Sequence, residues 1–150
     1  MKPVIVSTSA KRAPEEAYEF LDVLANHEPF VDHLLTDWSF SGPARGVGAM
    51  ARARTDAPGS QDWTEFEIVE SGPGRIVEQA VGANGKRRTR GTYTLEGLSD
   101  GGTRLSFELE WLEAARIEQF FGPLTRAFVR RANAKSMRRL RGLLEAEGSA

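Results

Sequence analysis

The chain has 150 residues, of which 40% are hydrophobic and 27% are charged, and its formal net charge is −1 at pH 7. This length suits one domain over residues 1–150 with one core, and the near-neutral charge argues against a nucleic-acid partner attracted by a global field. The absence of cysteine excludes disulfides, thiol nucleophiles and cysteine metal sites. We see neither a signal peptide nor a membrane span, so the sequence predicts a cytoplasmic protein.

The N-terminal part predicts one strand followed by two short helices. Residues 4–10, Val-Ile-Val-Ser-Thr-Ser-Ala, are rich in β-branched and hydroxyl side chains, which favours a strand. Residues 13–16, Ala-Pro-Glu-Glu, are typical of a helix start, because proline and acidic residues suit the first turn. An interruption at residues 26–29 separates this helix from a second short one over residues 30–35.

From residue 38 onward the hydrophobic period changes from that of a helix to that of a strand. Asn84-Gly85 is the strongest turn signal, since both residues accept the positive φ of a tight hairpin turn. Strands joined by such short turns predict an antiparallel meander. We expect these strands over residues 38–40, 47–55, 63–70, 75–81, 86–95 and 103–111.

Alternation of apolar and polar residues predicts which face of each strand is buried. The last strand shows it most clearly, and Phe66, Ile68 and Tyr93 lie on similar apolar faces. The apolar members of the last strand are Leu105, Phe107, Leu109 and Trp111.

The strand over residues 47–55 permits two orientations. We favour the one in which Val47 and the alanines at 49, 51 and 53 face inward, because burial of unpaired arginine is costly. In the other orientation, Arg52 and Arg54 point into the interior.

Residues 113–147 predict one long helix, with a bend at Gly122-Pro123 because proline removes a backbone donor. Its apolar stripe runs in steps of four and has small residues in the middle. These small residues either leave a cavity over a concave sheet, on the order of 300 Å³ or more, or let the helix approach the sheet closely. The stripe consists of Leu124, Phe128, Ala132, Ser136 and Leu140.

The remaining surface of this predicted helix is basic, since residues 113–147 contain eight Arg or Lys against four Glu. A solvated face explains this pattern, and a transient contact with an anionic membrane surface is the alternative. The basic residues of this face are Arg126, Arg130, Arg131, Lys135, Arg138 and Arg141.

The order of strand, two short helices, meander and long C-terminal helix resembles the helix-grip fold. The segments that carry this resemblance are residues 13–18, 66–70 with 73–75, 91–95 and 102–107. The chain is similar to the START-like, or SRPBCC, superfamily, and within it to the polyketide cyclase/dehydrase and lipid-transport group. The resemblance implies an α+β fold in which a curved seven-stranded antiparallel sheet wraps around the C-terminal helix, with the two short helices between strands 1 and 2.

The same resemblance implies that a small hydrophobic molecule, namely a lipid, polyketide or aromatic compound, binds in a cavity between the sheet and the C-terminal helix. A cyclase, aromatase or dehydrase that uses this cavity is the alternative. A third interpretation is a module whose helix grips another protein, which requires an exposed apolar patch and a cavity too small for cargo. We predict no cofactor and no metal, and the sequence does not predict the oligomeric state.

Predicted ligand-binding residues come from the inner faces of the strands and from the helix stripe. They are Trp38, Phe66, Ile68, Gln79, Tyr93, Leu105, Phe107, Leu109, Trp111, Leu124, Phe128, Ala132 and Ser136. Tyr93 stands out, because a phenol in an apolar interior needs a partner for its hydroxyl, which either Gln79 or a ligand supplies.

His27 and His33 are the chain's two histidines, and their spacing of six residues does not place both on one helical face. A metal site built on this pair is therefore not expected. We expect both at the surface or at helix ends. The candidate catalytic residues are His33 and Tyr93. His33, beside Asp32, is a candidate acid or base because a histidine titrates near neutral pH.

Overall fold

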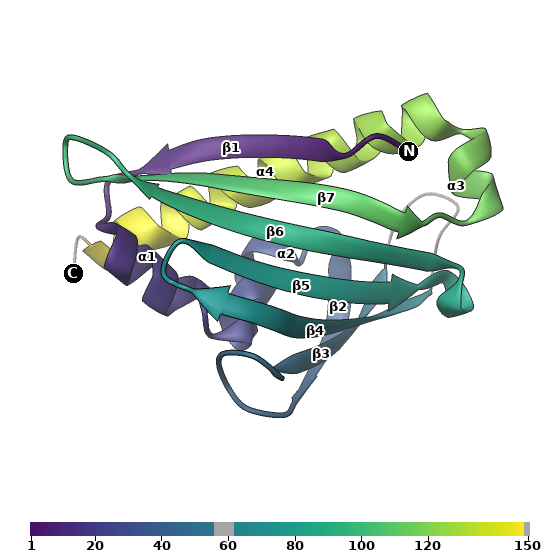
Figure 1. The fold of residues 1–150 in the computed structure, drawn as a ribbon, viewed down its shortest axis with the longest axis horizontal. Coiled ribbons are helices and arrows are strands. Elements are labelled where there is room, and N and C mark those ends of the chain that lie inside the picture. The colour runs from purple at the N-terminus through teal and green to yellow at the C-terminus, as the bar shows by residue number, and fades with distance from the viewer. Residues whose placement is uncertain (56–61, 149–150) are drawn as a thin grey trace.

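The computed structural model describes residues 1–55 and 62–148, which form a curved antiparallel sheet covered on one face by helices (Figure 1). The sheet has seven strands in the order β1-β7-β6-β5-β4-β3-β2. They are β1 (Val4–Ala10), β2 (Leu35–Ser41), β3 (Met50–Thr55), β4 (Trp63–Gly72), β5 (Arg75–Gly82), β6 (Arg87–Gly97) and β7 (Thr103–Glu113). This arrangement confirms the predicted α+β helix-grip architecture.

The helices lie between β1 and β2, at the β5–β6 turn, and after β7. They are α1 (Pro14–Leu21), η1 (Leu24–His27), α2 (Glu28–Val31), η2 (Ala83–Gly85), α3 (Arg116–Phe120) and α4 (Gly122–Gly148). The long helix α4 runs along β1 and also contacts α2 and β7. No helix within the described ranges is long and apolar enough to cross a membrane.

The orientation of β3 agrees with the favoured alternative. Ala51 and Ala53 are buried, whereas Arg52 and Arg54 are exposed on the outer face. The guanidinium of Arg52 lies 3.9 Å from the centroid of the Trp63 ring. This cation–π contact holds the arginine on the solvent-exposed face of β3 and β4. Val47 precedes the strand and is exposed, contrary to expectation.

The predicted helix over residues 113–147 begins later than expected. Glu113 pairs with Arg88 and extends β7, and Ala115 keeps an extended backbone before α3 begins. A break at Phe121 then separates α3 from α4, close to the predicted bend. Strand pairing at the end of β7 therefore outweighs the helical pattern of these residues.

The second short helix is also shorter than predicted. Helix α2 covers Glu28–Val31, while Leu35 belongs to β2, where it pairs with Thr55. Strand β2 has an irregularity between Thr36 and Ser39, which interrupts its ladder with β3.

The apolar stripe of α4 is buried over only part of its length. Ala132, Ser136 and Leu140 are buried, but Leu124 is 68% exposed and Phe128 is 38% exposed. Beyond the predicted stripe, the buried surface continues through Met137 and Leu144, which belong to the core together with Leu140. The C-terminal half of α4 is thus the half that packs on the sheet.

We expect Leu140→Ala to lower the free energy of unfolding by about 2–5 kcal/mol, because this fully buried side chain leaves a cavity when it is truncated. The matched variant Leu124→Ala removes the same atoms from an exposed position, so its effect should stay within about 0.5 kcal/mol. Urea denaturation of both variants measures the difference. Equal losses would contradict this division of the helix.

Candidate functional site

A cavity of about 510 Å³ lies between the inner face of the sheet and α4. Its walls are mainly apolar, which follows from the alternation of β6 and β7 and from the cover that α4 provides. The volume is sufficient for a small ligand, since ligand pockets usually measure roughly 300–1,000 Å³. Side chains that form these walls include Phe66, Ala80, Phe107, Leu109, Trp111, Val129 and Met137.

The cavity reaches the surface at the end of the sheet where α3 lies. Ile117, Phe121 and Leu124 line the cavity and are also among the exposed large apolar residues of the chain. Figure 1 shows α3 at the end of β7, where α4 begins. We call this group of three residues the apolar mouth.

Eight of the thirteen predicted ligand-binding residues line the cavity; they are Phe66, Tyr93, Phe107, Leu109, Trp111, Leu124, Phe128 and Ser136. Ile68, Leu105 and Ala132 are buried elsewhere in the protein and do not belong to the walls. Trp38 stacks on Phe66 with ring centroids 5.8 Å apart, but does not itself line the cavity. Ligand contacts of all these residues remain predictions.

Of the two partners considered for the Tyr93 hydroxyl, Gln79 does not reach it. Gln79 is exposed on the outer face and pairs with Arg90, whereas its neighbour Glu78 lines the cavity. Alternation along β5 contains the missed signal, because Ile76 and Ala80 are buried and Glu78 shares their parity.

Glu78 carries its carboxylate into the cavity over a position that has no side chain. It pairs with Gly91 on β6, and a Cβ atom at Gly91 would lie 2.8 Å from Oε1 of Glu78 and 2.8 Å from Cζ of Phe107. Glycine therefore leaves room for both side chains, which would have to shift to accommodate a Cβ atom. The carboxylate and the Phe107 ring meet above Gly91, and we call this arrangement the glycine notch.

Burial raises the pKa of Glu78 to about 7. Within residues 1–55 and 62–148, no group donates a hydrogen bond to this carboxylate or forms an ion pair with it. Burial, followed by the nearby Glu78 charge, also raises the pKa of Tyr93, and no hydrogen bond from the described residues reaches its hydroxyl. The inner part of the cavity thus presents a carboxyl group that titrates near neutral pH beside a phenol.

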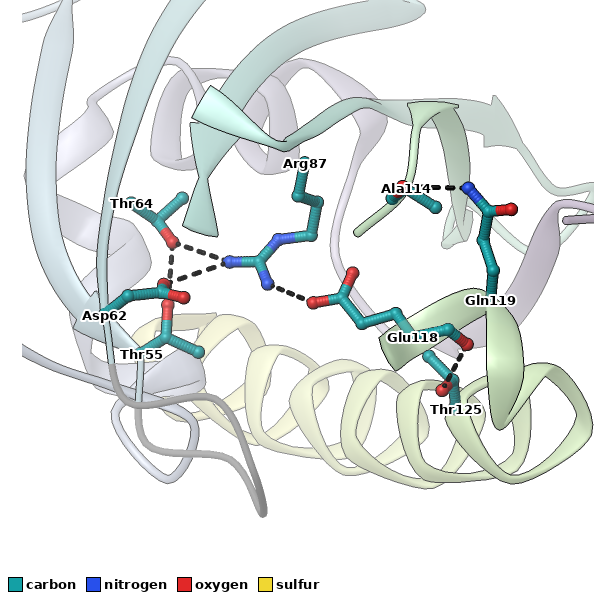
Figure 2. Close-up of polar contacts among 8 residues, drawn as sticks. All are labelled: Thr55, Asp62, Thr64, Arg87, Ala114, Glu118, Gln119 and Thr125. Atoms are coloured by element: carbon teal, nitrogen blue, oxygen red, sulfur yellow. Dashed lines mark hydrogen bonds and ion pairs between the residues drawn. The ribbon is translucent and has the colours of Figure 1, made fainter. Parts of the chain in front are cut away.

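A second polar group lies near the mouth (Figure 2). Nη1 of Arg87 donates to Oε2 of Glu118 at 2.7 Å, and its Nη2 lies 3.3 Å from both Asp62 Oδ1 and Thr64 Oγ1. Gly82 makes room for this guanidinium, because a Cβ atom there would clash with Nη2 of Arg87. The contact joins β6 to α3 across the end of the cavity.

Two buried polar atoms near this space lack a hydrogen-bond partner in the described part of the chain. They are Nδ2 of Asn133 on α4 and Oε1 of Glu118 on α3, and both residues line the cavity. Because an unsatisfied buried polar atom costs free energy, both are available to a ligand or to water.

His33 joins the segment after α2 to α4. Its Nε2 donates to the carbonyl oxygen of Ala132 at 3.0 Å, and its Nδ1 accepts from Arg139 at 3.3 Å. Burial is the largest of the effects that lower the pKa of His33. Both ring nitrogens are engaged and the side chain does not line the cavity, so we assign His33 a structural contact.

His27 lies at the end of η1, one of the two expected kinds of position, and is buried there. Its Nε2 donates to the carbonyl oxygen of Leu21 at 2.7 Å, and its ring contacts Tyr93 with centroids 5.4 Å apart. Burial lowers the pKa of His27 to about 4, so the ring is neutral at pH 7.

The predicted basic face of α4 is largely accessible. Arg130, Arg131, Lys135, Arg138 and Arg141 are exposed, and contact of this face with a membrane remains a prediction. Arg126 is partly engaged, because its guanidinium donates to the carbonyl oxygens of Lys2 and Pro3.

Solved structures of several proteins share this architecture. The Zhui aromatase/cyclase from Streptomyces sp. R1128 is 13% identical, with a TM-score of 0.77 over 96% of this chain and 93% of that one. A START superfamily protein from Mycobacterium smegmatis is 12% identical, with a TM-score of 0.72 and coverage of 96% and 97%. The protein TTHA0849 from Thermus thermophilus is 16% identical, with a TM-score of 0.74 and coverage of 97% and 99%.

No family model matches the sequence, and no curated protein matches it. The structural likeness, at low sequence identity, is a likeness of fold. The chain therefore shares the helix-grip fold with these solved structures.

The shifted pKa values of Glu78 and His27 affect stability in opposite directions. Glu78 is expected to stabilise the fold fully below its unfolded pKa of 4.5 and to lose this contribution as the pH rises to about 7. His27 is expected to stabilise the fold fully above its unfolded pKa of 6.5 and to lose this contribution as the pH falls to about 4.

We therefore expect wild type to lose roughly 3 kcal/mol of stability relative to Glu78→Gln as the pH rises from the unfolded pKa of 4.5 to above about 7. Denaturant unfolding of both proteins at several pH values measures the difference. Glu67→Gln, which removes an exposed carboxylate from β4, is the control and should follow wild type. A constant difference between wild type and Glu78→Gln would show that Glu78 does not titrate in this range.

Proposed function

We propose that the chain binds a small hydrophobic molecule, such as a lipid, polyketide or aromatic compound, in the cavity between the sheet and α4. The observation that carries this proposal is a cavity of about 510 Å³ with mainly apolar walls and an apolar mouth. A ligand that leaves water for such a space gains about 25 cal/mol for each Å² of apolar surface buried.

The distribution of polar groups supports binding of a molecule that is largely apolar. Most wall residues are aliphatic or aromatic, and a few polar groups, including Glu78, Tyr93 and Asn133, are placed among them. Such a combination favours affinity from the apolar walls and orientation from the polar groups. The likeness in fold to a START superfamily protein and to the Zhui aromatase/cyclase agrees with a container of this kind.

Ala80→Leu should weaken binding of the neutral probe 1-naphthalenemethanol by at least about tenfold, because the new side chain occupies the cavity. The matched variant Gln79→Leu adds a leucine to the outer face of the same strand and should bind as wild type does. Isothermal titration calorimetry measures both affinities, and circular dichroism confirms the fold. Native mass spectrometry of the purified protein then identifies any molecule that it carries.

Equal binding by wild type and Ala80→Leu would place the probe outside the cavity. No binding to folded wild type would count against a container for aromatic molecules of this size.

A second candidate function is catalysis of a cyclase, aromatase or dehydrase type, which Glu78 favours. A general acid or base acts best when its pKa lies near the working pH, and burial raises the pKa of Glu78 to about 7. In this case Glu78 would exchange a proton with a bound reactive chain, beside the hydroxyl of Tyr93.

If this candidate is correct, a linear poly-β-ketone thioester incubated with wild type should yield ring products faster than in buffer. Glu78→Gln should lose most of this acceleration, and Glu67→Gln should retain it. Chromatography of the products measures the rates. Equal rates for wild type and Glu78→Gln would leave binding as the function of the cavity.

A further inference from the structure

The charges on the cavity wall do not balance. Three charged residues of the described chain line the cavity, namely Glu78, Arg87 and Glu118. Arg87 and Glu118 form an ion pair at 2.7 Å, so their charges compensate each other. Glu78 has no counter-charge among the described residues, and the wall therefore carries an excess negative charge whenever this carboxylate is ionised.

The surroundings of Glu78 suit a cation. Oε1 of Glu78 and the Cε1–Cζ edge of the Phe107 ring both lie over Gly91 in the glycine notch, and the Phe107 and Tyr93 rings lie in contact with centroids 4.6 Å apart. Aromatic faces attract cations, and they do so most strongly where water is largely excluded. A carboxylate flanked by two aromatic rings thus offers both an ion-pair partner and a polarisable wall.

Unsatisfied acceptors on the wall point in the same direction. Oε1 of Glu118 has no donor in the described part of the chain, and neither has the carboxylate of Glu78. The unpartnered atom of Asn133 is its side-chain nitrogen, a donor, which would serve an acceptor atom of the ligand. The two carboxylates are thus the wall groups that lack donors, and an ammonium group would supply them.

We propose that the ligand of this cavity is an apolar amine whose protonated nitrogen binds the Glu78 carboxylate in the glycine notch beside Phe107 and Tyr93. This inference rests on the proposed binding function and narrows its ligand class. It disfavours fatty acids and other anions, because the Glu78 charge would repel their carboxylates. The cation on the described part of the wall, Arg87, is already paired with Glu118.

Titration of Glu78 gives the proposal a pH signature. An ammonium group stabilises the ionised carboxylate, so binding should strengthen as the pH rises through about 7. The neighbouring groups do not change their charge near pH 7, so they do not mask the pH dependence that Glu78 produces. Tyr93 on β6 and His27 on η1 are both neutral at this pH, and Arg87 and Glu118 are paired with each other. From β4 and α4, the residues that line the cavity are uncharged.

Three naphthalene probes of nearly equal size separate charge from shape. They are 1-naphthalenemethylamine, 1-naphthalenemethanol and 1-naphthoate, which present a cation, a neutral group and an anion. Calorimetry at about pH 5.5 and about pH 8 measures their affinities, and an alkylamine remains largely protonated at both values. At the higher pH we expect the amine to bind at least about tenfold more tightly than the alcohol, with naphthoate weakest.

Glu78→Gln should abolish both the advantage of the amine over the alcohol and its pH dependence. Glu67→Gln, on the outer face, should leave both intact. Circular dichroism and denaturant unfolding verify that each variant is folded.

Two kinds of failure are distinguishable. If the alcohol binds but the amine binds no more tightly, or keeps its advantage in Glu78→Gln, the inference is overturned and the container function stands. If folded wild type binds none of the three probes, the proposed function fails and the inference fails with it.

Discussion

The packing of α4 on the sheet through one half of its length determines the rest of the structure. Met137, Leu140 and Leu144 are buried at the C-terminal half, whereas Leu124 and Phe128 at the other half line the cavity and remain partly exposed. Because the sheet is curved, a helix whose apolar stripe is buried over only one half of its length leaves space beneath the other half. If the apolar stripe were buried along its whole length, this space would be filled. The cavity therefore exists together with the exposure of Leu124 and Phe128.

Two glycines place charged groups in this apolar space. Gly91 leaves room for the Glu78 carboxylate and the Phe107 ring, and Gly82 leaves room for the guanidinium of Arg87. A glycine within a strand weakens the strand, so its presence opposite a charged side chain costs stability at both positions. The two sites differ in electrostatics, because Arg87 is paired with Glu118 while Glu78 relies on protonation, water or a ligand.

Local patterns predicted the architecture well, because each strand buries one face. The alanines of β3 and the apolar residues of β7 lie as their alternation predicted. Prediction was less accurate where a distant contact decides the outcome. Pairing with Arg88 draws Glu113 into β7 despite its helical surroundings. The inward position of Glu78 follows the alternation of β5, but a carboxylate on a buried face contradicts the usual hydrophobic pattern, and its glycine partner emerges only from the pairing across the sheet. The extent of the cavity could not be predicted, because it depends on how far α4 stands from the sheet.

The ion pair between Arg87 and Glu118 separates two properties of the cavity that are often linked. Glu78 lies in the glycine notch, whereas this pair joins β6 to α3 beside the mouth. On the proposed binding function, a ligand that passes the apolar mouth would pass this charge-assisted hydrogen bond of 2.7 Å, so loss of the pair would alter the rates of entry and exit. The ammonium contact proposed for the glycine notch would instead alter the equilibrium preference among ligands. Substitutions of Arg87 or Glu118 would then change the exchange rates of the ligand, and substitutions of Glu78 would change its equilibrium affinity.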